Sequence, residues 1–451
     1  MRWGGEARPI SLFLIFIMRL IFPLLWSING LYRPQKLITN RYAVSVRSFR
    51  TNDEKYPILY VESLKDLQDM AQALRTLKEI GVDLEFDRNS YTYGFNLCLL
   101  QVSGNNINYI VDPLSTKMLS LNPLFEIFED SFIQKIFHSP SEDLRLLHSL
   151  NCYPRNIFDT EVAAKLLNTQ YTGLATLIST NLGLSIEKSD KISRSNWMKR
   201  PLSDSQIAYA AADVIHLSEL KRVLVEKCSE KGLLHILEEE NIRWETFREK
   251  SDDRDNFLSS KDKKFLSPFQ AHVFNGMLKL VDKYAQKFNK PAGYIIRKQD
   301  LIEYMFPQLR EYSVTEMPPS QATELVDNQY VFRPLPFAGL KNVHWVMQKP
   351  ETIAAFKQQY EMVFKEAIAL QLHLPNATMS KTKQKLHLCL RALDEIMTET
   401  LVPNYGEYAA HFLLSRTLVA KVIEGAVNMS EVPAFRRGLL TEVFNKAGVS
   451  F

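Results

Sequence analysis

Cysteine is scarce in this chain, with only four residues in 451, each far from the next. They form no CxxC pair and have no metal-ligand spacing, which argues against a disulfide framework and against a structural zinc site. The four are Cys98, Cys152, Cys228 and Cys389. Because Cys98 and Cys152 stand beside leucine or aromatic residues, we expect buried, reduced thiols and a cytoplasmic protein.

Neither sign of charge is in large excess, since 55 lysines and arginines against 51 acidic residues leave a net charge of only +4. An excess this small does not indicate a nucleic-acid-binding protein, and it would not repel nucleic acid. Hydrophobic residues make up 46% of the chain and charged residues 24%, which is an ordinary globular balance. The length allows about two or three domains, each able to bury a core.

One long hydrophobic run stands near the N-terminus, at Ile10–Trp26. It is long enough for a signal peptide or a membrane anchor. Arg19 lies in its middle, where a charge is costly in hydrocarbon, and no small-x-small cleavage site follows. A third interpretation is that translation begins downstream and residues 1–50 are not native. We expect no membrane association, although the run leaves an anchor open.

Residues 56–248 alternate between strand and helix patterns, which predicts a mixed α/β sheet with flanking helices. Ser141 and Ser203 are the predicted N-caps of two of the helices, and Gly81 is the predicted stop of the first one. The predicted strands are 57–63, 81–88, 95–103, 106–113 and 132–139, with a hairpin at 103–106 and a strand turning into a helix at 156–168. The predicted helices are 66–81, 123–130, 141–151 and 203–228.

The rest of the chain has a different composition. Residues 249–264 are nearly all polar, which predicts a linker. Residues 265–345 are expected to form a helical domain. Residues 350–451 continue as helical stretches, which form either a second bundle of the same kind or a helical region of another role.

Asp83 and Glu85 lie two residues apart on an apolar strand, so both side chains point to one face of the sheet. Two neighbouring carboxylates repel each other and are costly to desolvate, and a cation between them removes both problems. The alternative is a solvent-exposed face on which the pair is incidental.

Asp143, Asp213 and Tyr209 add a second set of candidates. Asp143 stands in the first turn of a predicted helix, where an acid is common because it interacts with the helix dipole. Asp213 stands in the middle of a predicted helix among alanines and aliphatic residues, where aspartate is unfavourable. Tyr209 lies one turn earlier on the same helix face, although a tyrosine at this spacing is more often part of the core.

Taken together, the four acids and the tyrosine are the set that phosphodiester hydrolysis needs. Two divalent ions roughly 3.5–4 Å apart neutralise the phosphate, activate a water molecule and stabilise the leaving oxygen. Oxygen ligands favour Mg²⁺ or Mn²⁺ over Zn²⁺. The sequence therefore predicts a site with two divalent metal ions.

The ordered acids also resemble those of a known family. VDLEFDRNSYTYGFNLCLLQVS, IFHSPSEDLRLLHSL and YAAADVIHLSEL resemble the three motifs of the ribonuclease D group, in the tyrosine-bearing subclass of the DEDD (DnaQ-like) exonuclease superfamily. KSDKISRSNWMKRPL resembles the run that precedes the third motif, although Asn196 replaces an aspartate common there. The resemblance covers about residues 57–245 and implies a ribonuclease H-like fold.

The resemblance assigns roles to these residues. Asp83, Glu85, Asp143 and Asp213 would hold two metal ions, and Tyr209 would position or help deprotonate the attacking water. Four further residues are candidates for substrate contact: Gln101, His138, Trp197 and Arg200. For His138 the alternative is a hydrogen-bonded histidine in the core. For Trp197 and Arg200 the alternative is that they tether their loop to the sheet.

Residues 266–305 resemble an HRDC domain, a small helical bundle that often follows exonuclease domains of this group. Their lysines and arginines would form a basic face along a phosphate backbone, or a solvated surface. The chain is thus expected to be a 3′–5′ exoribonuclease that releases nucleoside 5′-monophosphates from single-stranded 3′ ends, such as those of tRNA precursors. The alternatives are a DNA exonuclease of repair and a non-catalytic nucleic-acid-binding protein. No obligate protein partner is evident.

Overall fold

The computed structural model describes residues 48–49, 56–186, 189–247, 256–259, 262, 266–305, 325–326, 329–330, 344, 349–370 and 381–449. The apolar run at Ile10–Trp26 lies outside these residues, as does most of the predicted linker. Within the described part of the chain, no helix is both long enough and apolar enough to cross a membrane.

The sheet has seven strands and is mixed, as the sequence predicted. Their order across the sheet is β1-β2-β5-β4-β3-β6-β7. Neighbours are parallel in β2/β5, β3/β6 and β6/β7, and antiparallel in β1/β2, β5/β4 and β4/β3. The strands are β1 (Ser48–Phe49), β2 (Ile58–Val61), β3 (Glu79–Arg88), β4 (Phe95–Gly104), β5 (Ile107–Val111), β6 (Gln134–Phe137) and β7 (Ile157–Asp159).

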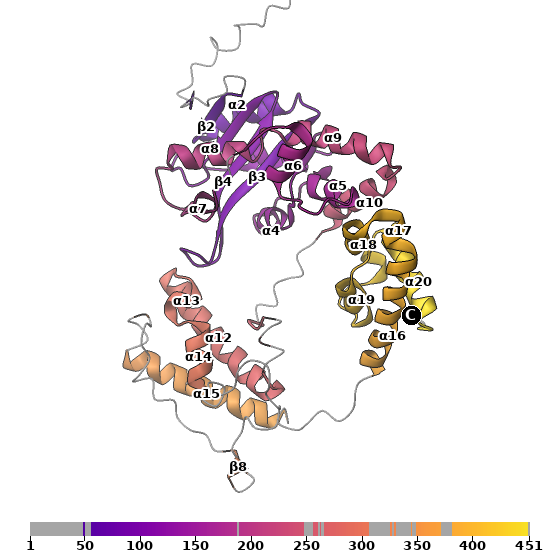
Figure 1. Cartoon of the computed structure of the whole chain (residues 1–451). Coiled ribbons are helices and arrows are strands. Elements are labelled where there is room, and N and C mark those ends of the chain that lie inside the picture. Colours follow the sequence, from indigo (N-terminus) through magenta and orange to yellow (C-terminus); the bar gives the residue numbers. More distant parts are fainter. Residues whose placement is uncertain are drawn as a thin grey trace, which may run out of the picture. The chain divides into compact units, whose positions relative to one another are not determined.

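Helices cover both faces of the sheet (Figure 1). One face of β3 and β4 packs its aliphatic residues, such as Leu84 and Val102, against α2 (Leu64–Leu74), α3 (Asn122–Glu129) and α4 (Ser141–Ser149). The opposite face carries Leu99 and Ile110, which pack against α8 (Asp204–Ala212). The remaining helices of this α/β part are α5 (Thr160–Leu166), α6 (Leu174–Leu182), α7 (Asp190–Ser193), α9 (Leu217–Glu230) and α10 (Leu234–Thr246).

Gly81 is not the helix stop that the sequence predicted. Helix α2 ends at Leu74, and Glu79–Gly81 instead begin β3, where they pair in parallel with β6. The glycine is needed for a close approach, because a Cβ atom at position 81 would lie 2.5 Å from the Ser103 hydroxyl and 3.0 Å from the Val214 carbonyl oxygen.

Two helix predictions were wrong in detail. The single helix predicted for 203–228 is broken at residues 213–216 into α8 and α9, so Asp213 is the C-cap of α8 and not a mid-helix residue. Ser203 is its N-cap, as predicted, and forms a capping box with Gln206. Ser141 lies inside α4, whose N-cap Pro140 has no side-chain hydrogen bond.

Beyond the α/β part, most of the residues that the structure describes lie in helices. Helix α12 (Pro268–Phe288) is followed by α13 (Ala292–Ile295), α14 (Lys298–Met305) and the short strands β8 (Leu325–Val326) and β9 (Gln329–Tyr330). Helix α15 (Pro350–Ala369) packs against α12 in one apolar cluster, so it belongs with α12 and not with the C-terminal helices. The identity of this part as an HRDC domain stays a prediction.

The C-terminal helices form their own apolar cluster, which includes Cys389. All four cysteines are free and buried, as predicted. The Arg436 guanidinium donates to the buried Glu240 carboxylate of α10 at 2.8 Å, which links these helices to the α/β part. The elements are α16 (Lys381–Ile396), η4 (Met397–Leu401), α17 (Val402–Tyr405), α18 (Glu407–Leu413), α19 (Arg416–Ile423), η5 (Met429–Glu431) and α20 (Ala434–Lys446).

Candidate active site

Strand β3 carries two acids on the face of the sheet that α8 covers. Alternation turns Val82 and Leu84 into the apolar core, so Asp83 and Glu85 point to the opposite face. Both acids are half-buried. The arrangement that the sequence predicted for this pair is therefore present.

Asp213 joins the pair from the break between α8 and α9. Its carboxylate is 6% exposed. Asp83, Glu85 and Asp213 each have a carboxylate oxygen within 4.8 Å of those of the other two. Three acids this close repel one another strongly unless a cation or protons neutralise them.

Asp143 reaches the same strand from another direction. Parallel pairing of β6 with β3 ends at Gly81, and α4, which follows β6, brings Asp143 alongside the open edge of β3. There the Leu84 amide donates a hydrogen bond to the Asp143 carboxylate, between the positions of Asp83 and Glu85. Burial raises the pKa of Asp143 to about 7, against the lowering effect of hydrogen bonds from its own backbone amide and from that of Leu84.

Tyr209 lies in α8, one helical turn before its C-cap Asp213, which keeps a helical backbone conformation, so the two side chains project from the same side of the helix. The Tyr209 side chain is half-buried. Its ring lies 6.2 Å from that of Trp197, at an interplanar angle of 46°. The tyrosine is thus partly core and partly accessible.

The acid cluster, which consists of Asp83, Glu85 and Asp213 with Asp143 beside β3, fits divalent metal ions. Its donor atoms are carboxylate oxygens, which hard cations such as Mg²⁺ and Mn²⁺ prefer. The buried Asp143 carboxylate, with its raised pKa, also favours a nearby cation as the partner that keeps it ionised. The donor set does not distinguish magnesium from manganese.

Gln101 and His138 take different positions from each other. Gln101 pairs directly with Asp83 across the β3–β4 ladder, so both side chains lie on the same face. Its side chain is fully buried, and neither amide atom has a hydrogen-bond partner. His138 is half-buried, and its Nδ1 lies 2.9 Å from the Thr160 hydroxyl, which matches the alternative of a hydrogen-bonded core histidine.

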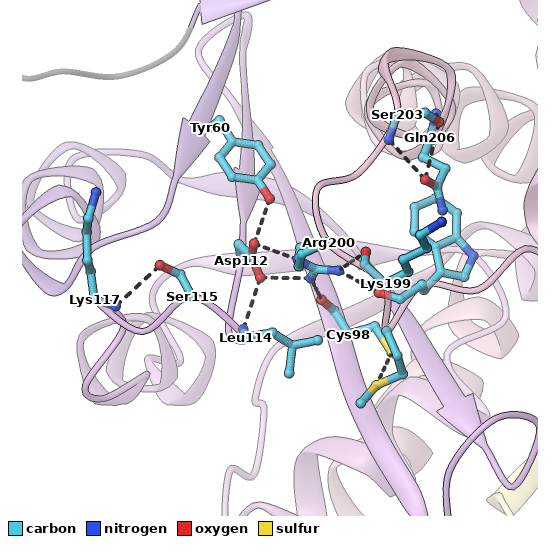
Figure 2. A network of polar contacts seen from close by, with 12 residues as sticks. Tyr60, Cys98, Asp112, Leu114, Ser115, Lys117, Lys199, Arg200, Ser203 and Gln206 are labelled. Atoms are coloured by element: carbon cyan, nitrogen blue, oxygen red, sulfur yellow. Dashed lines mark hydrogen bonds and ion pairs between the residues drawn. The ribbon is translucent and has the colours of Figure 1, made fainter.

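Trp197 and Arg200 hold the loop before α8 in place through hydrogen bonds. Trp197 is 3% exposed and donates its indole N–H to the Ser193 carbonyl. Figure 2 shows Arg200 facing Asp112, with two hydrogen bonds of 2.7 Å between them. Its other donors reach the carbonyls of Trp197, Lys199 and Cys98. All five guanidinium N–H groups therefore have protein acceptors, and none remains for a phosphate.

Two residues of this region escaped the sequence analysis. Asp112 ends β5, is 4% exposed, and accepts hydrogen bonds from Tyr60, Arg200 and the Leu114 amide. Burial alone would raise the pKa of Asp112, but its hydrogen bonds from Arg200 and Tyr60 hold it below its usual value. Ser103 donates its hydroxyl to the Val214 carbonyl at 2.7 Å. For Asp112, the only signal in the sequence was an aspartate at the end of an apolar run. For Ser103 the sequence offered no signal, because a buried serine has no distinctive pattern.

Comparison with known proteins identifies this part of the chain. The 3′–5′ exonuclease family matches residues 58–229, which include every acid of the cluster and Tyr209. Residues 58–229 are therefore similar to a 3′–5′ exonuclease domain. This match agrees with the exonuclease motifs that the ordered acids resemble.

Several curated relatives of this chain are named ribonuclease D. That of Gluconacetobacter diazotrophicus is 35% identical over 180 residues, covering 40% of this chain and 44% of its own length. That of Granulibacter bethesdensis is 29% identical over 267 residues, covering 55% and 62%. The chain thus spans about half the length of these two relatives.

A solved structure extends the likeness in fold. The crystal structure of Escherichia coli RNase D, described as an exoribonuclease involved in structured RNA processing, covers 86% of this chain and 98% of its own. The TM-score is 0.61 and the identity 20%, so this comparison shows a shared fold and nothing finer. It confirms the predicted mixed sheet followed by helices.

Proposed function

We propose that this protein is a 3′–5′ exoribonuclease of the ribonuclease D type. It would hydrolyse the terminal phosphodiester bond of an RNA 3′ end and release nucleoside 5′-monophosphates. The observation that carries the proposal is the acid cluster: Asp83, Glu85 and Asp213 with oxygens within 4.8 Å of one another, and Asp143 bound to the backbone between the first two.

The four acids would hold two divalent ions, Mg²⁺ or Mn²⁺. When bound, the ions supply charge neutralisation at the phosphate and a more acidic water molecule. The sheet and α8 hold the carboxylates in place before substrate arrives, which avoids reorganisation during the reaction. The Tyr209 hydroxyl would accept a hydrogen bond from the attacking water and orient it toward the phosphorus.

Several observations support RNA as the substrate and the cytoplasm as the location of the protein. The matching relatives are named ribonuclease D, and the similar Escherichia coli structure is described as acting on structured RNA. A single-stranded 3′ end, such as that of a tRNA precursor, is the substrate that such an enzyme would take. Four free, buried cysteines suit a reducing compartment.

The test is digestion of matched RNA and DNA oligonucleotides, each labelled at its 5′ end, with Mn²⁺, with Mg²⁺ and with chelator. We expect stepwise shortening of the RNA from its 3′ end, dependent on metal and lost in Asp213→Asn. Faster digestion of the DNA would replace the RNA assignment with that of a DNA exonuclease. No digestion of either, or equal digestion by Asp213→Asn, would contradict the proposal.

A further inference from the structure

Helix α8, which carries Tyr209 and ends at Asp213, is bonded to the sheet at each of its ends. We propose that Arg200 and Ser103 are positioning residues of the exonuclease site, Arg200 setting the place of Tyr209 and Ser103 that of Asp213. The inference rests on the proposed function. Neither residue is expected to touch the substrate or a metal ion.

The first attachment is the ion pair between Arg200 and Asp112. Asp112 ends β5 in the middle of the sheet, and Tyr60 of β2 donates its hydroxyl to the same carboxylate at 2.7 Å (Figure 2). Arg200 also donates to the Cys98 carbonyl of β4 at 2.7 Å. Three adjacent strands therefore fix this one guanidinium through hydrogen bonds of good length.

This attachment lies close in sequence to the start of α8. Only Pro201 and Leu202 lie between Arg200 and Ser203, the N-cap of α8. Leu202 is buried in the apolar cluster beneath the helix, and the capping box fixes the first turn. Arg200 also donates to the carbonyl of Trp197, whose ring lies against that of Tyr209. The ion pair thus anchors both the start of α8 and the aromatic neighbour of Tyr209.

The second attachment lies just beyond the other end of α8. Ser103 of β4 donates its hydroxyl to the carbonyl of Val214, the residue after Asp213. Ser103 pairs with Gly81 across the ladder, and Asp83 is two residues further along β3 on the same face. The absence of a side chain at Gly81 leaves room for the bond. Ser103 therefore ties the chain that carries Asp213 to the part of the sheet that carries Asp83.

The length of α8 makes these attachments effective. Its nine residues span about 13 Å, and a helix this short moves as one body. Loosening one end lets the helix pivot about its attachment at the other end, so loosening its start should displace Tyr209 more than Asp213, and loosening its end should displace Asp213 more than Tyr209. A displacement of one ångström at a reacting group is enough to lower a rate roughly 100-fold.

The end of the helix is tested with Ser103→Ala, which removes one hydroxyl and adds no bulk. We expect Mn²⁺ affinity, measured by calorimetry, to fall roughly 10-fold, as for other residues that orient metal ligands. The kcat should return close to the wild-type value at saturating Mn²⁺. Ser149→Ala is the matched control, since the Ser149 hydroxyl makes the same kind of bond, to Leu146 at 2.7 Å, within α4.

The start of the helix is tested with Arg200→Lys, which keeps the charge but has three donors instead of five and no planar fork. We expect kcat to fall roughly 10- to 100-fold while Mn²⁺ affinity stays unchanged, and excess Mn²⁺ should not restore the rate. Asp112→Asn should show the same split in milder form. Arg75→Lys, in an exposed pair with Glu126, is the control and should leave both quantities unchanged.

Hydrogen exchange in the full chain gives a readout independent of activity. Exchange should rise at Ser203–Tyr209 in Arg200→Lys and at 213–217 in Ser103→Ala. Wild-type Mn²⁺ affinity in Ser103→Ala, wild-type kcat in Arg200→Lys, or the same change in both variants would overturn the inference. If the wild-type protein digests no RNA, the proposed function fails, while Mn²⁺ affinity and exchange at each end of α8 still decide whether Ser103 and Arg200 act as proposed.

Discussion

Gly81→Ala is expected to destabilise the exonuclease domain beside its acid cluster. The added Cβ would lie 2.5 Å from the Ser103 hydroxyl, 3.0 Å from the Val214 carbonyl oxygen and 3.2 Å from the Leu217 Cβ. Ordinary contacts begin near 3.4 Å, so the chain between α8 and α9 must move away from β3 by several tenths of an ångström. Ser103 could rotate away only by losing its bond to Val214.

The size of the effect follows from three contributions. Overpacking costs about 1–3 kcal/mol. Loss of the buried Ser103 hydrogen bond adds about 1 kcal/mol. The reduced freedom of the unfolded chain returns about 0.4–1 kcal/mol. The free energy of local opening should therefore fall by about 1–4 kcal/mol.

The assay is hydrogen exchange of the peptides that cover β3 and β4 in the full chain, because a protein with several units does not unfold in one step. Gly173→Ala is the control, since a Cβ there meets nothing within 4 Å. It should change the opening free energy by less than about 1 kcal/mol. Equal or slower exchange in Gly81→Ala than in wild type would refute the reasoning.

Three further predictions concern the site and its support. Tyr209→Phe should lower kcat roughly 10²- to 10⁴-fold with little change in KM, and an unchanged rate would return the tyrosine to the core. The raised pKa of Asp143 stabilises the metal-free protein below about pH 4, and this contribution is lost as the pH rises to about 7; Asp143→Asn should therefore flatten the profile of Tm against pH, and an equally steep profile would contradict this. Arg436→Ala removes the short hydrogen bonds to the buried Glu240 and leaves it the 3.5 Å pair with Arg243, so the opening free energy from hydrogen exchange across α10 and α20 should fall by about 1.5–3 kcal/mol, against less than about 1 kcal/mol for exposed Arg416→Ala.

The sheet and the acids could be predicted because each follows a local pattern. Alternation placed Asp83 and Glu85 on one face, and helical spacing placed Tyr209 with Asp213. The hairpin between β4 and β5 followed from its Gly-Asn-Asn turn. Asp143 was recognisable only through the order of the motifs, since an acid in the first turn of a helix is common.

Contacts between distant parts of the chain could not be predicted. The helical pattern of α8 and α9 runs on through Asp213, and only the packing of the two helices on different clusters breaks it. Gly81 looked like a helix stop because the close approach that requires it comes from Val214. The partner of Arg200 lies 88 residues away, at the end of β5, and no spacing rule joins the two.

Titration of the metal-free protein with Mn²⁺, followed by calorimetry, is the most direct test of the central claim. We expect the wild-type chain to bind two Mn²⁺ ions. Asp213→Asn and Asp83→Asn should each bind at least one ion fewer, with lower affinity for any ion that remains. The variants should keep the wild-type far-ultraviolet circular dichroism spectrum. Binding that is absent in the wild type, or unchanged in both variants, would contradict the assignment of the acid cluster as the metal site.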